Sequence, residues 1–85
     1  MVIIGINKGG LSMIYYVIEI QTSDGAGAVI PFSFSDRNVA EAKYHSLLSV
    51  CATSTVPKHG AMLFNDDGFI LKSEVYNHIE PEPEV

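Results

Sequence analysis

Hydrophobic and polar positions alternate along two stretches in the first half of the chain, and this alternation predicts two strands. Residues 14–21 are rich in β-branched and aromatic side chains, and their even-numbered members share one face. A turn signal follows, and residues 26–33 then read as a second strand. Pro31 cannot donate a hydrogen bond to a neighbouring strand, so we expect an edge strand or a bulge there. The two stretches together predict a β-hairpin.

The middle of the chain changes to a helical period. Asn38, with Glu41 three residues later, resembles a capping arrangement at a helix N-terminus. We therefore predict a helix over residues 39–53. Its apolar stripe falls within about 100° of arc at helical spacing and consists of Ala40, Tyr44, Leu47, Leu48 and Cys51.

A second hairpin is predicted in the last third of the chain, from residues 59–64 and 69–78. The Asp-Gly pair between them favours a two-residue type I′ loop, which would place Phe64 opposite Leu71. One face of this hairpin would then carry Met62, Phe64, Phe69, Leu71 and Val75.

The order ββαββ predicts one α+β domain over residues 13–79, in which two hairpins form a small, mainly antiparallel sheet and the helix packs on one face. A chain of 85 residues has room for a single domain. A single helix leaves the other sheet face uncovered, and an exposed apolar face of that size tends to mark a contact surface. The alternative is scattered apolar surface residues, which monomers tolerate. On the predicted register the contact residues are Tyr15, Val17, Leu63, Ile70 and Tyr76.

The first residues suggest a translated leader. The tripeptide Lys8-Gly9-Gly10 can be encoded by a string that contains a bacterial ribosome-binding sequence, at a normal spacing from Met13. We therefore expect Met13 to be the biological start and residues 1–12 to be non-native leader or a flexible N-terminus. The alternative is a genuine N-terminal strand over residues 2–6.

Charge and cysteine content narrow the partners and the compartment. The net charge is −5, but Glu80, Glu82 and Glu84 lie in an acidic Pro/Glu tail over residues 80–85. The five basic residues are scattered, so we expect no direct nucleic-acid binding. The single Cys51 excludes an intramolecular disulfide and favours a reducing cytoplasm. No segment has the 18 or so apolar residues that span a bilayer, so no membrane partner is expected.

Few residues could carry chemistry. The three histidines and Cys51 are the only soft metal ligands, and their spacing matches no metal motif, so neither a metal nor a cofactor is expected. Cys51 lies on the apolar stripe and is expected to be buried. His45 and His59 could form a polar site if the helix edge approaches the third strand; alternatively His45 lies on the helix surface and His59 in a turn beside Gly60. No catalytic residue is predicted.

Three stretches, residues 16–21, 42–48 and 56–61, resemble small uncharacterised proteins of prophages and mobile elements in gut Firmicutes. The likeness covers most of residues 14–78. It implies a phage or mobile-element setting, and it carries over no catalytic residue. We expect a cytoplasmic bacterial protein, with association with a virion as the alternative.

The sequence therefore predicts a non-enzymatic protein-interaction or structural module that self-associates through its uncovered sheet face or binds another protein. One alternative is an acidic inhibitor of a host nucleic-acid-binding or defence protein, which would need carboxylates arrayed on one folded face. Another is a small ligand-binding protein or hydrolase that uses His45 and His59.

Overall fold

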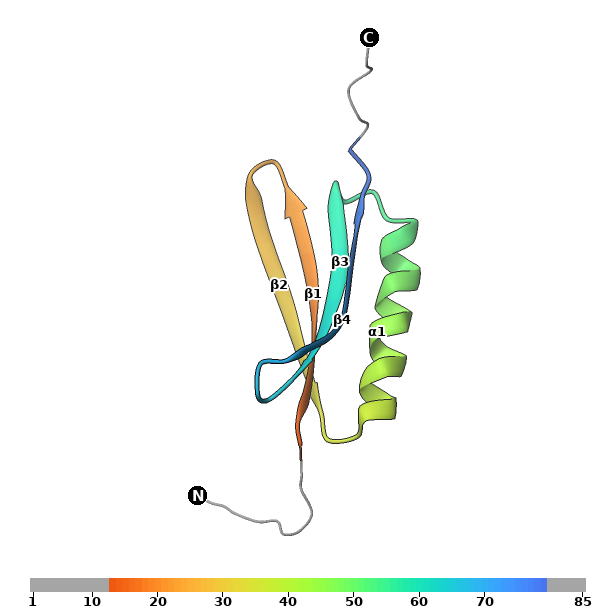
Figure 1. Ribbon diagram of the computed structural model, residues 1–85. Coiled ribbons are helices and arrows are strands. Elements are labelled where there is room, and N and C mark those ends of the chain that lie inside the picture. Colours follow the sequence, from red (N-terminus) through yellow and green to blue (C-terminus); the bar gives the residue numbers. More distant parts are fainter. Residues whose placement is uncertain (1–12, 80–85) are drawn as a thin grey trace.

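A computed structural model describes residues 13–79 of the chain, and it confirms the predicted α+β order ββαββ (Figure 1). The proposed leader and the acidic tail lie outside the described residues. The elements are β1 (Tyr15–Ser23), β2 (Ala26–Phe34), α1 (Arg37–Ala52), β3 (Lys58–Asn65) and β4 (Ile70–Asn77).

The strands form one antiparallel sheet in the order β2-β1-β3-β4. The first and third strands are therefore central, and each hairpin contributes one edge strand. Pro31 lies in the edge strand β2, as its missing N–H predicts. Helix α1 runs along one side of the sheet and leaves the other side open (Figure 1).

The two hairpin turns differ in type. Asp24 and Gly25 both have positive φ, 52° and 78°, as a two-residue type I′ loop requires. In the second turn only Gly68 has positive φ, and the Asn65 N–H donates to the Phe69 carbonyl at 3.1 Å. This is a three-residue loop closed by a left-handed glycine, so the predicted two-residue loop is wrong.

The longer loop changes the register of β4 only next to the turn, while the pairing of Met62 with Ser73 is the one that the two-residue loop also gives. Phe64 pairs with Ile70, and the pairing shifts between Leu63 and Phe64. The predicted pairing of Phe64 with Leu71 is therefore wrong by one residue. Since one residue of shift moves a side chain to the other face, Leu71 packs against the core.

Helix α1 begins earlier than the sequence predicts because Asp36, not Asn38, is its N-cap. The Asp36 carboxylate oxygen Oδ1 accepts the backbone N–H groups of Asn38 at 2.8 Å and Val39 at 3.4 Å. Asn38 therefore lies inside the first turn, and its backbone N–H is one of the groups that Asp36 caps. The predicted apolar stripe is confirmed: Ala40, Tyr44, Leu47 and Cys51 are buried, and Leu48 packs against them.

The core lies between the helix stripe and the central strands. Val17, Ala61 and Leu63 are fully buried there. The next shell of the core consists of half-buried apolar side chains, and the Lys43 ammonium lies 4.1 Å above the ring of one of them, Phe32. The other members of this shell are Tyr15, Phe34, Leu48 and Leu71.

Candidate functional site: the open sheet face

The side of the sheet away from α1 carries a continuous set of apolar side chains, which we call the open sheet face. Residues directly opposite one another in antiparallel strands point to the same side. The register pairs Tyr16 with Phe64, and it pairs Ile18 with both Met62 and Pro31. The apolar members of the open sheet face are Tyr16, Ile18, Ile20, Val29, Pro31, Met62, Phe64, Ile70 and Val75.

Exposure rises from the centre of this face to its margins. The rings of Tyr16 and Phe64 stack at 5.4 Å between centroids, and these central side chains are half-buried by their neighbours. At the edge strands Val29, Ile70 and Val75 are 59%, 52% and 48% exposed. Among the described strand residues on this side, Lys58 is the single charged one, and it lies at the end of the face.

The structure corrects most of the predicted contact residues. Val17 and Leu63 have no exposed surface, because they lie beneath α1. Tyr15 packs against the same core, and Tyr76 pairs with the buried His59, so it also lies on the helix side. Of the five predicted residues, Ile70 alone belongs to the open sheet face. The physical reason is that β1 is apolar on both sides, so its alternation does not identify the face that the helix covers.

The candidate polar site is also arranged differently. His45 is exposed on α1, where its ring meets the edge of the Tyr44 ring at 5.3 Å. His59 is only 4% exposed and lies within β3. Its two ring nitrogens contact Glu19 and Ser54, so the structure does not join the two histidines in one site. The surface position of His45 is confirmed, whereas the expectation of a turn histidine at position 59 is wrong.

Around His59 the structure forms a buried polar cluster. Nε2 lies 2.6 Å from the Glu19 carboxylate, and Nδ1 lies 2.7 Å from the Ser54 hydroxyl. The same hydroxyl oxygen accepts the Val56 N–H at 2.9 Å, and the Gln21 amide donates to Glu19 at 3.1 Å. A neutral imidazole that donates from Nε2 and accepts at Nδ1 satisfies every one of these contacts.

This cluster has the composition of a Ser-His-carboxylate triad, in which both imidazole nitrogens are likewise engaged. It differs in that His59 is buried and the Ser54 hydroxyl oxygen also accepts the Val56 N–H, so the contacts hold segments of the chain together. The contacts tie β1 to β3 and to the connection after α1. The sequence signal that could have indicated them is the pair Glu19 and Gln21, two polar residues on one side of an otherwise apolar strand, which the predicted polar site did not include.

Two further ionisable groups are buried in the core. Burial raises the pKa of the Cys51 thiol, and the negative charge of Glu19 adds to this effect. Burial likewise raises the pKa of the Tyr44 hydroxyl, with further contributions from Glu74 and Tyr76. A neutral, buried thiol is a poor nucleophile, so the predicted core role of Cys51 is confirmed by its position.

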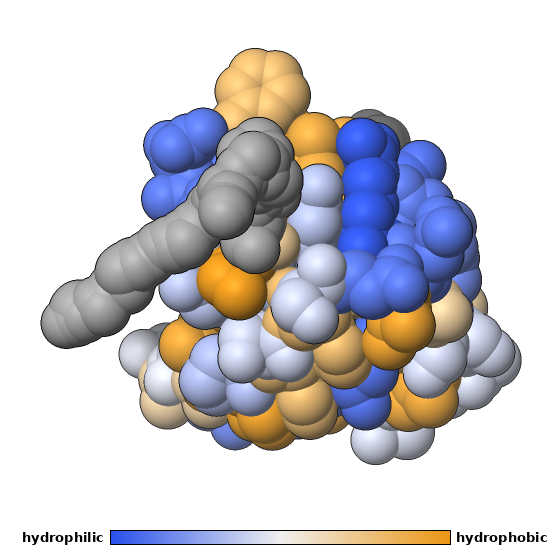
Figure 2. All heavy atoms as spheres, turned by 90° about the horizontal axis from the view of Figure 1, so that it is seen from below, coloured by the Kyte–Doolittle hydropathy of each residue, from blue (hydrophilic) through white to orange (hydrophobic). Residues whose placement is uncertain are grey.

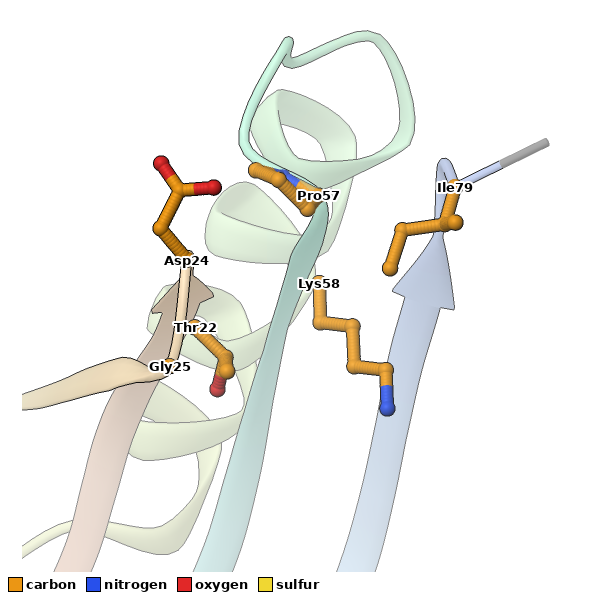
Figure 3. A pocket seen from close by; sticks show the side chains of 6 residues that line it. All are labelled: Thr22, Asp24, Gly25, Pro57, Lys58 and Ile79. Atoms are coloured by element: carbon orange, nitrogen blue, oxygen red, sulfur yellow. The ribbon is translucent and has the colours of Figure 1, made fainter.

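A shallow hollow of about 450 Å³ lies at the end of the open sheet face that carries Lys58. It forms where the β1–β2 turn, the start of β3 and the segment after β4 meet (Figure 3). The Lys58 side chain lies in front of the sheet there, on the side away from α1, whereas Asp24 points away from it (Figure 3). The residues that line the hollow are Thr22, Asp24, Gly25, Pro57, Lys58 and Ile79.

His78 holds the segment after β4 in place beside this hollow. Its backbone N–H donates to the Pro57 carbonyl at 2.7 Å, and its ring Nε2 donates to the Cys51 carbonyl at 2.8 Å. The third histidine therefore fixes the position of Ile79, which forms one apolar wall of the hollow.

Comparison of the chain with models of protein families, with curated proteins and with solved structures gave no match. Within residues 13–79 no three histidine, cysteine or acidic side chains gather as a metal site would require. The helix in this part of the chain is too short and too polar to cross a membrane.

Proposed function

We propose that this protein is a non-enzymatic protein-interaction module that self-associates, with two copies packing their open sheet faces together. The observation that carries the proposal is the open sheet face itself, a continuous apolar surface on the side that α1 leaves bare. Contiguous apolar surfaces of this kind mark interaction sites in soluble proteins.

The dimensions of the face support this assignment. Four strands about 4.8 Å apart, with eight residues each at about 3.3 Å, cover roughly 500 Å² per copy. Two copies together would cover about 1,000 Å², which reaches the lower limit for specific protein interfaces. The area therefore suits a small, reversible dimer.

The chemistry of the face favours a second copy as the partner. Along its described strands the face carries one charged residue, Lys58 at its end, so the rest of the face can meet an identical face without burying an unpaired charge. Two twisted antiparallel sheets pack face to face in this way in β-sandwiches, and a two-fold axis generates the contact from one self-complementary surface. The bacterial and phage-related setting that the sequence resemblance implies is part of the same proposal, in the cytoplasm or in a virion.

Analytical ultracentrifugation of the full chain over a range of concentrations tests the proposal. We expect a dimer whose population rises with concentration. Met62→Lys at the centre of the face and Val75→Lys at its margin should both give monomers, because each would bury an unpaired ammonium. Circular dichroism should show that both variants keep the fold, since neither side chain belongs to the core.

The matched control is Val50→Lys, which introduces the same charge at a valine that is 58% exposed on α1. This variant should dimerise like the unsubstituted chain. A chain that stays monomeric at every concentration, or a dimer that survives both Met62→Lys and Val75→Lys, would contradict the proposal.

A further inference from the structure

The open sheet face carries a projection at one end and a hollow at the other. The turn between β3 and β4 projects from the sheet on the side away from α1 (Figure 1). It presents Phe69, which is 64% exposed, beside the exposed Asp66 and Asp67. Viewed from this end, hydrophobic surface lies directly next to strongly hydrophilic surface (Figure 2).

The hollow has the complementary chemistry. Its walls include the apolar Pro57 and Ile79, and its charged residues are Lys58 and Asp24, whose side chains point in opposite directions (Figure 3). The projecting turn offers one aromatic ring and two carboxylates. Asp66 already accepts the Ile14 N–H at 3.2 Å, whereas the Asp67 carboxylate has no hydrogen bond within the described part of the chain.

One chain cannot bring these two features together. Lys58 begins β3 and Asp66 directly follows its end, eight residues away, and an extended strand covers about 26 Å over that length. A second chain can join them if its strands run in the opposite direction. Met62 is the midpoint between Lys58 and Asp66 in the sequence, and it pairs with Ile18 on the same face.

Resting on the proposed function, we propose that the two copies pack with antiparallel strands about a two-fold axis that passes near Met62. Phe69 of each copy then enters the hollow of the other, and Asp67 of each copy meets Lys58 of the other. A two-fold axis parallel to the strands is the alternative. It would place Lys58 of one copy near Lys58 of the other and would bring like charges together. Charge complementarity therefore selects the antiparallel arrangement.

Crosslinking distinguishes the two arrangements. The double variant Lys58→Cys/Asp67→Cys and the two single variants are treated with a bismaleimide much shorter than β3, with the unsubstituted chain as a control for the buried Cys51. The antiparallel arrangement predicts covalent dimers from the double variant and none from either single variant. The length of β3 excludes a crosslink within one chain.

Covalent dimers from Lys58→Cys alone would overturn the antiparallel arrangement. The proposal that the open sheet face is the interface would still stand. A dimer in the ultracentrifuge with no crosslink in the double variant would also overturn it. If the unsubstituted chain is a monomer in the ultracentrifuge, the proposed function itself fails. Failure of the antiparallel arrangement and failure of the proposed function therefore give different results.

Charge reversal provides a second, independent readout. Lys58→Glu and Asp67→Lys should each weaken dimerisation roughly tenfold, and the combined variant should recover most of that loss because the pair is restored in the opposite sense. Phe69→Ser should weaken dimerisation by a similar factor, and neither charge reversal should compensate for it. If the dissociation constant of the combined variant rises by the product of the two single fold-changes, Lys58 and Asp67 do not contact each other.

Discussion

The imidazole of His59 and the carboxylate of Glu19 meet at 2.6 Å beneath the helix, although 40 residues separate them in the sequence. Their side chains are 5% and 14% exposed. Because Gln21 is the residue directly opposite His59, the contact to Glu19 runs diagonally from β3 to β1. The cluster thus fixes the register of the two central strands and, through Ser54, the path of the chain after α1.

Removing both partners of this pair should cost less than the sum of the two single removals. Glu19→Leu leaves His59 with an unpaired buried nitrogen, and His59→Leu leaves a buried carboxylate with only the Gln21 amide. We expect each single variant to lower the free energy of unfolding by about 1–3 kcal/mol. The double variant should lose less than the sum, because neither His59 nor Glu19 is then left buried without the other.

Urea unfolding at one fixed protein concentration measures these values, since dimerisation would make stability depend on concentration. Ser54→Ala is the matched control for the other side of the ring. It removes two neutral hydrogen bonds, to His59 and from the part-buried Val56 N–H, and leaves no buried charge unpaired, so we expect a loss of about 1 kcal/mol. Additive losses for Glu19 and His59 would mean that the two side chains do not stabilise each other.

Gly60 is the one position in the central strands where a side chain has no room. A Cβ atom there would meet the backbone carbonyl of Glu74 and would lie 2.7 Å from Cγ2 of Val75. Gly60→Ala should therefore push β4 away from β3 and lower the free energy of unfolding by about 2 kcal/mol or more. Hydrogen exchange should show the loss of protection concentrated in β4.

The control for this substitution is Gly27→Ala in the edge strand β2, where the nearest atom to an added Cβ is 4.0 Å away. This variant should be neutral or slightly stabilising, because alanine restricts the unfolded chain more than glycine does. Equal destabilisation by both variants would show that crowding against β4 is not the cause.

The N-cap assignment predicts a difference between two neighbouring polar residues. Asp36→Ala removes the carboxylate that accepts two N–H groups of the first turn, and it should cost about 1 kcal/mol of stability. Asn38→Ala should change stability by less than about 0.5 kcal/mol, because its exposed side chain caps nothing. Thermal unfolding followed by circular dichroism measures both, and the reverse order of effects would restore Asn38 as the cap.

The sequence was sufficient for the order of elements and for the helix face, because both depend on periods that are visible locally. It was not sufficient for the sheet faces. Tyr15, Tyr16, Val17 and Ile18 form an unbroken apolar run, so either alternate set could face the helix. The choice depends on which side chains fit beneath Tyr44 and Leu47, and that is a property of the packed core.

The same limit applies to the candidate site. The cluster around His59 depends on a diagonal contact between strands that are distant in the sequence, which no local spacing encodes. The exposed position of Phe69 depends on a three-residue turn, whereas Asp-Gly equally suits a two-residue turn. A change of one residue in that turn moves Phe69 from the predicted sheet surface to the projecting loop.

Tyr44 predicts how stability depends on alkaline pH. Burial against the sheet, with the nearby Glu74, raises the pKa of its hydroxyl above the ordinary value, which the unfolded chain retains. Above a pH of about 10 the unfolded chain therefore loses this proton more readily than the folded chain does. The contribution of Tyr44 is fully present below that pH, and it falls as the pH rises toward the folded value.

The test compares the free energy of unfolding of the unsubstituted chain and of Tyr44→Phe between pH 8 and pH 11. Other tyrosines and the lysines titrate in both proteins, so only the difference between the two curves reports on position 44. We expect that difference to be constant up to a pH of about 10 and then to shift in favour of Tyr44→Phe. A difference that stays flat across the whole range would show that the Tyr44 hydroxyl ionises equally easily in the folded and the unfolded chain.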